Sequence, residues 1–89
     1  MPPTADEFRQ ELYKVMHEAV KRGKGYIDID AGELHGRVGD YSGPNHRMPD
    51  CCQVMKAAIA ADYEDVILHE PASGQGASLT IRYVLPRPA

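Results

Sequence analysis

The sequence predicts a small α+β domain of three helices and a three-stranded, hairpin-containing sheet. Apolar residues recur with helical spacing near the N-terminus, whereas residues 78–85 alternate between apolar and polar types as a strand does. A Gly-rich loop joins that strand to the apolar segment 65–69, which is typical of a β-hairpin. A chain of 89 residues has room for a single domain over residues 1–89, and we expect its ordered core to span about residues 4–85.

The first helix is marked at both ends. Thr4 and Glu7 have the spacing of a capping box, in which the two side chains satisfy backbone N–H groups at the start of a helix. Gly23 supplies the stop, just after cations that suit the last turn. Six apolar residues recur on one face of this helix: Phe8, Leu12, Val15, Met16, Ala19 and Val20.

A short strand and a second helix follow. Residues 26–29 alternate and are bounded by glycine, so we expect a small strand. Asp30 and Glu33 repeat the capping-box spacing and open a helix that runs through Val38 and ends at Gly39. The apolar stripe of this helix consists of Leu34 and Val38.

The third helix comes after a turn cluster over residues 40–44. We expect it to begin at Pro49, because proline suits the first helical position and disfavours helical geometry in the residue before it. Its expected inner side consists of Cys51, Cys52, Met55, Ala58, Ile59 and Asp62. Its expected outer side consists of Asp50, Gln53, Lys56 and Ala57. In the hairpin, a flexible loop over residues 71–77 leads to a last strand whose inner face consists of Leu79, Ile81, Tyr83 and Leu85.

This order of elements resembles the winged helix-turn-helix family over residues 4–85. The resemblance implies that the short strand pairs with the hairpin, that the third helix enters the DNA major groove, and that the hairpin loop, or wing, contacts the DNA backbone or minor groove. Residues 43–55 also resemble a segment of small uncharacterised bacterial proteins, which implies no activity. One departure is the turn over residues 39–48, because a helix-turn-helix normally uses 3–4 residues there.

The first hypothesis is therefore duplex DNA binding, in transcriptional or related regulation, by a possible homodimer that pairs through the first helix. Arg pairs with guanine and Asn or Gln with adenine, and glycines let a loop backbone approach a phosphate. The candidate groove residues are Asn45, His46, Arg47, Gln53 and Lys56, and the candidate wing residues are Gly74, Gln75, Gly76 and Arg82. In the alternative interpretation Asn45 caps a turn, His46 and Arg47 are solvated, and the glycines only shape a hairpin turn.

Charge favours a second hypothesis, a protein–protein interaction module on the same scaffold. Ten Lys and Arg stand against thirteen Asp and Glu, a net charge of −3, whereas DNA-binding domains are usually basic. The N-terminus has no secretory signal and no segment has the length and apolarity of a membrane span, so we expect a cytoplasmic protein without membrane contact.

A third hypothesis is a small metal or thiol site at His46, Cys51 and Cys52, with His35 nearby. Adjacent cysteines on a helix point about 100° apart, so they rarely share one zinc ion or bridge each other. We expect both thiols to lie in the core as small hydrophobic groups and to remain reduced, as in the cytoplasm. The sequence therefore predicts no catalytic residue, no metal and no cofactor, and a chain that is not an enzyme.

Overall fold

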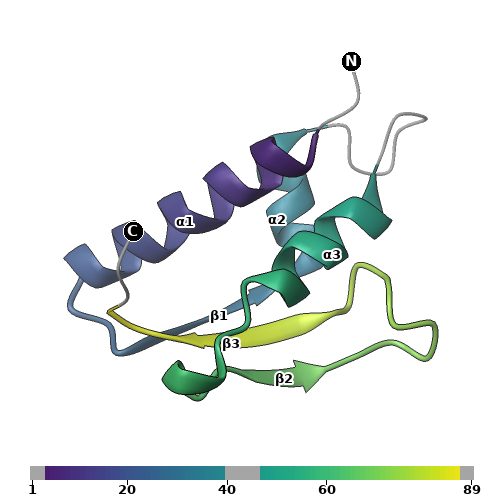
Figure 1. Cartoon of the computed structure of the whole chain (residues 1–89). Coiled ribbons are helices and arrows are strands. Elements are labelled where there is room, and N and C mark those ends of the chain that lie inside the picture. The colour runs from purple at the N-terminus through teal and green to yellow at the C-terminus, as the bar shows by residue number, and fades with distance from the viewer. Residues whose placement is uncertain (1–3, 40–46, 87–89) are drawn as a thin grey trace.

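The computed structural model describes residues 4–39 and 47–86 and has the predicted α+β architecture, with helices packed on one side of an antiparallel sheet (Figure 1). The elements in order are α1 (Ala5–Lys21), β1 (Tyr26–Asp30), α2 (Ala31–Val38), α3 (Met48–Ala57), the 3₁₀ turn η1 (Ala61–Tyr63), β2 (Val66–His69) and β3 (Thr80–Val84). None of the described helices is long and apolar enough to cross a bilayer.

The sheet is built around β3. Its strand order is β1-β3-β2, and both pairings are antiparallel. The alternation of the last strand confirms its predicted inner face, because Leu79, Ile81, Tyr83 and Leu85 are all buried against the helices. The fully buried Tyr83 also donates its hydroxyl to the backbone carbonyl of Met55 over 2.7 Å, which joins β3 to α3.

The capping box of α1 is confirmed, and at α2 the Asp30 half of the predicted box is present. The Thr4 hydroxyl accepts the Glu7 N–H at 3.2 Å, and the Glu7 carboxylate accepts the Thr4 N–H at 3.2 Å. The carboxylate of Asp30 accepts the Glu33 N–H at 2.6 Å. Asp30 is also the last residue of β1, where it lies opposite Thr80, so β1 passes into α2 without a linker.

Three local expectations were wrong. Val20 is 36% exposed, because it lies at the margin of the apolar stripe of α1, while the other five predicted residues are buried. α3 begins at Met48, one residue before Pro49, and ends at Ala57, so Asp62 belongs to η1 and not to the inner side of α3. Val54, which was assigned to neither side of the helix, is buried. The predicted turn over residues 40–44 lies outside the described residues.

The core assignment makes a stability prediction. Leu12 and Ile81 are completely buried, so Leu12→Ala or Ile81→Ala should each lower the free energy of unfolding by about 2–4 kcal/mol, measured by urea denaturation. Val20→Ala is the matched control, because this side chain is partly exposed and its truncation should cost much less. A Leu12→Ala protein as stable as the parent would contradict the assigned face of α1.

Candidate nucleic-acid interface

α3 has one buried face and one exposed face. The buried side chains are Met48, Cys51, Cys52, Val54 and Met55. On the solvent side lie Gln53 and Ala57, both exposed, and the exposed Arg47 occupies the N-cap position, while Asp50 is half-buried. Arg47 and Gln53 are thus the two predicted groove residues that α3 presents to solvent; Asn45 and His46 lie outside the described residues.

The start of α3 is held by His35, which the sequence analysis named only as a neighbour of a metal or thiol site. The completely buried His35 of α2 accepts the backbone N–H of Arg47 through Nε2 at 2.8 Å. Its ring packs at a tilt against Phe8, with centroids 4.9 Å apart. His35 therefore positions the residue that opens α3. A lone histidine on a short helix gave no signal of this role, because its partner is twelve residues away.

The hairpin loop is tied to α3 by Lys56. Its ammonium group donates to the Gly74 carbonyl at 2.7 Å and lies 2.6 Å from a carboxylate oxygen of Glu70. Gly74 has a φ of +79°, a left-handed conformation that favours glycine. Two predicted site residues, Lys56 and Gly74, are thus in direct contact, and the charge of Lys56 is already balanced by Glu70.

Cys52 makes a second tie to the same loop. Its thiol donates to the Gly76 carbonyl at 3.5 Å and accepts the Gly76 N–H at 3.3 Å. A Cβ at Gly76 would lie 3.3 Å from the ring of Pro71, so glycine allows the loop to fold closely on itself. The Gln75 N–H is bound by the Ser73 hydroxyl at 3.3 Å, which leaves the exposed Gln75 side chain as the outward polar group.

Arg82 lies apart from these residues, on the sheet face opposite α3. Its neighbour Tyr83 points toward α3, and successive side chains of a strand alternate between faces. The guanidinium group binds both carboxylate oxygens of Asp28 at 2.7 and 3.0 Å and lies 4.3 Å from the ring centre of Tyr26. The hydrogen bond from Arg82 lowers the pKa of Asp28. Arg82 is therefore a cross-strand partner of β1 and does not adjoin residues 74–76.

The two thiols are buried, as predicted. Cys51 and Cys52 are free, completely inaccessible, and point to different partners, since Cys51 donates to the Ala31 carbonyl at 3.6 Å. Burial raises the pKa of Cys51 from an ordinary value of 9.0 to about 12, so this thiol stays protonated at neutral pH. Within residues 4–39 and 47–86, no three His, Cys, Asp or Glu side chains are grouped to hold a metal ion. The predicted ligand His46 lies outside that part of the chain.

Comparison with known proteins adds no family. No family model matches the sequence, and no curated protein or solved structure is significantly similar to it. Functional inference therefore depends on the residues and their geometry.

Because the Cys51 thiol is buried, we predict that the protein loses stability in alkali. The unfolded chain loses the Cys51 proton near pH 9.0 while the folded protein keeps it to about pH 12, so the free energy of unfolding falls as pH rises through this range. Between pH 8 and pH 10 this group should contribute a loss of about 1.4 kcal/mol, measured by urea denaturation at each pH. Cys51→Ala should show a correspondingly smaller decrease. Equal decreases in both proteins would contradict the raised pKa.

The tie between Lys56 and the loop is also testable. Lys56→Met should raise the rate of protease cleavage within residues 70–78 several-fold, while the free energy of unfolding changes by less than about 1 kcal/mol, because the two side chains of the ion pair are 35% and 44% exposed and solvent screens their attraction. Lys14→Met is the control, since Lys14 makes no ion pair with the described residues. A loop that stays equally resistant would show that its other contacts, such as those of Cys52 and Gly32, hold it without Lys56.

Proposed function

We propose that the chain is a winged-helix-like domain that binds duplex DNA, in transcriptional or related regulation, with α3 in the major groove and the β2–β3 loop on the backbone. The order of elements supports this proposal. The strand order β1-β3-β2 supports it too, because it places β1, the strand between α1 and α2, beside the β2–β3 hairpin. The observation that carries it is the exposed face of α3 beside a loop that Lys56 and Cys52 fix to the same helix.

The chemistry of that face suits base edges. Arg47 precedes the first turn of α3, where reading helices usually meet the bases, and its guanidinium group pairs with guanine in bidentate fashion. Gln53 offers an amide for adenine, and the exposed methyl group of Ala57 can contact a thymine methyl. In the loop, the Gln75 side chain is exposed and can reach the DNA backbone.

Charge limits the electrostatic part of the binding. Lys56 is paired with Glu70 and Arg82 with Asp28, so neither cation can contact a phosphate without losing its partner. The proposal therefore expects few phosphate contacts. The logarithm of the binding constant should fall with the logarithm of salt concentration at a slope shallower than about −3.

A protein–protein interaction module is the second candidate, and the outer face of the sheet favours it. Three large apolar side chains are about half exposed there or on its edge strands: Tyr26 at 50%, Val66 at 46% and Leu68 at 46%. The charge of Arg82 on this face is neutralised by Asp28, so the face is better suited to a protein surface than to a phosphate backbone.

Fluorescence anisotropy with mixed-sequence duplex DNA tests the first candidate, titrated from low to physiological salt. Micromolar binding is expected, and Arg47→Ala and Gln53→Ala should each weaken it by about tenfold, which corresponds to about 1.4 kcal/mol, without changing thermal stability. Gln10→Ala is the matched control, since Gln10 is an exposed glutamine on α1, away from the interface. No binding at low salt, or equal losses in all three variants, would refute DNA binding through α3.

A further inference from the structure

β1 is an edge strand, and its pairing fixes which backbone groups face outward. On one side it pairs with β3, where Leu85 donates its N–H to the Gly25 carbonyl at 2.9 Å. Hydrogen-bonded and non-bonded pairs alternate along an antiparallel ladder. Ile27 therefore turns its N–H and C=O toward β3, whereas Tyr26 and Asp28 turn theirs away from the sheet.

These outward groups are unused within residues 4–39 and 47–86. The backbone N–H and C=O of Tyr26 and Asp28 make no hydrogen bond to this part of the chain, and together they present two donors and two acceptors in a row. Such an edge is a template for another strand. The opposite edge differs, because β2 has an irregular register between Ile67 and His69, a feature that discourages pairing.

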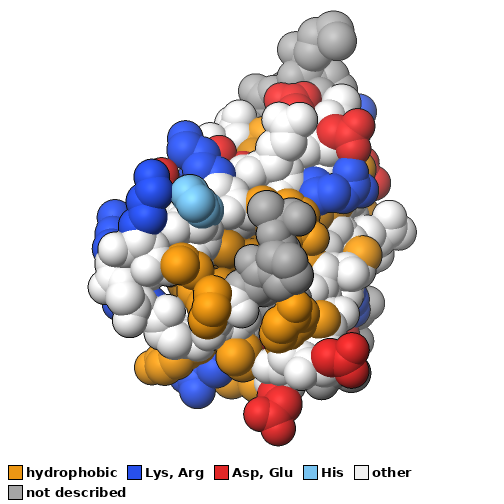
Figure 2. Space-filling view, turned by 60° about the vertical axis from the view of Figure 1, so that its left-hand side comes forward, with side chains coloured by type: hydrophobic (Ala, Val, Ile, Leu, Met, Phe, Trp, Pro, Cys, Tyr) orange, Lys and Arg blue, Asp and Glu red, His pale blue; other side chains and the backbone are white. Residues whose placement is uncertain are grey.

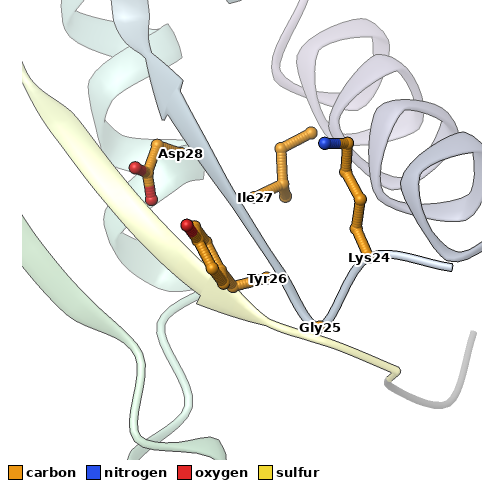
Figure 3. Close-up of a pocket in the computed structure, with 5 residues that line it drawn as sticks. All are labelled: Lys24, Gly25, Tyr26, Ile27 and Asp28. Carbon is orange, nitrogen blue, oxygen red and sulfur yellow. The ribbon is translucent and has the colours of Figure 1, made fainter. Parts of the chain in front are cut away.

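A shallow depression of about 350 Å³ runs along the open edge and is lined by residues 24–28 (Figure 3). Figure 3 shows Lys24 and Ile27 on the side of β1 that faces α1, and Tyr26 and Asp28 on the other side, next to β3. Arg82 holds the latter two side chains in place through its ion pair and its contact with the ring. The side chains on the outer face of β1 are thus held by Arg82, whereas Lys24 and Ile27 on the α1 side can contact the side chains of an added strand.

The surroundings of the depression are positively charged. Lys24 lines it, and Lys21 and Arg22 end the helix that leads into it. These three cations are exposed and form no ion pair with the described residues. Asp28, the one acid among the five lining residues, is paired with Arg82. Figure 2, which brings this end of the molecule forward, shows several Lys and Arg side chains beside a histidine, with acidic side chains next to them.

We propose that β1 binds an extended acidic peptide segment by strand addition. Backbone bonds to Tyr26 and Asp28 supply the pairing, an apolar residue of the segment packs over Ile27, and a carboxylate meets Lys24. A second copy of the chain is a poorer occupant, because it would bring two sets of the same cations to one edge. The site is distinct from the α3 surface and does not depend on DNA binding there.

The probe is the synthetic peptide acetyl-Thr-Glu-Thr-Val-Thr-Glu-Thr-amide, whose symmetric pattern offers the same side chains in either strand direction. Amide hydrogen exchange is followed by NMR on the full chain with and without the peptide. At saturation, exchange at Tyr26 and Asp28 should slow by about tenfold or more, while exchange at Ile27, already bonded to β3, should change little. The same peptide N-methylated at alternate residues should have no effect, because it cannot complete the ladder.

Charge is tested separately by variants. Lys24→Glu should weaken binding of the acidic peptide about fivefold or more, which corresponds to about 1 kcal/mol, whereas Lys14→Glu changes the net charge equally but lies outside the depression and should have a smaller effect. A peptide with Lys in place of both Glu residues should bind the parent protein more weakly. Thermal unfolding of each variant confirms that the fold is retained.

Several results would overturn the proposal. They are unchanged exchange at Tyr26 and Asp28 with millimolar peptide, protection that maps to β2, and equal losses from Lys24→Glu and Lys14→Glu. Protection of Tyr26 and Asp28 that grows with protein concentration alone, with a dimer in analytical ultracentrifugation, would assign the edge to a second copy instead. Failure of the DNA experiment would leave each of these readouts unaffected.

Discussion

β3 is the strand on which the domain depends, because it is paired along both edges and supplies much of the buried side of the sheet. Its inner residues meet all three helices through one core, and the hydroxyl of Tyr83 reaches the carbonyl of Met55 near the end of α3. That bond satisfies two polar groups in a site without water access, where leaving either unpaired costs about 1–3 kcal/mol. The position of α3 relative to the sheet is therefore set by apolar packing and by one directional contact.

The loop between β2 and β3 is held by side chains of α3 as well as by the two strands that it joins. Polar side chains on two successive turns of the helix, Cys52 and Lys56, each bind a carbonyl of the loop, and Cys52 also accepts an N–H from it. Glu70 at the start of the loop completes the contact. A ligand that touches both the helix and the loop would therefore meet a surface whose two parts are already aligned, and less ordering is required on binding.

The sequence predicted what local patterns determine. The caps at Thr4 and Asp30 and the alternating residues from Leu79 onward depend on neighbours in the chain, and the structure confirms them. Contacts between distant segments were beyond this reasoning. Arg82 and Asp28 are separated by 54 residues, and Lys56 and Gly74 by 18, so nothing in the order of residues indicated that these side chains are already engaged. The role of His35 was missed for the same reason.

The order of the strands also bears on how the chain folds. β2 and β3 are neighbours in sequence, with His69 and Thr80 paired across 11 residues, whereas Asp30 and Thr80 are paired across 50. Closing the longer loop costs about 1.3 kcal/mol more in chain entropy. We therefore expect the hairpin to form early and β1 to join late, with contacts made chiefly at the end of the process. A strand that joins last is also the first to detach, so brief native-state openings would expose β1 while the hairpin and α3 remain assembled.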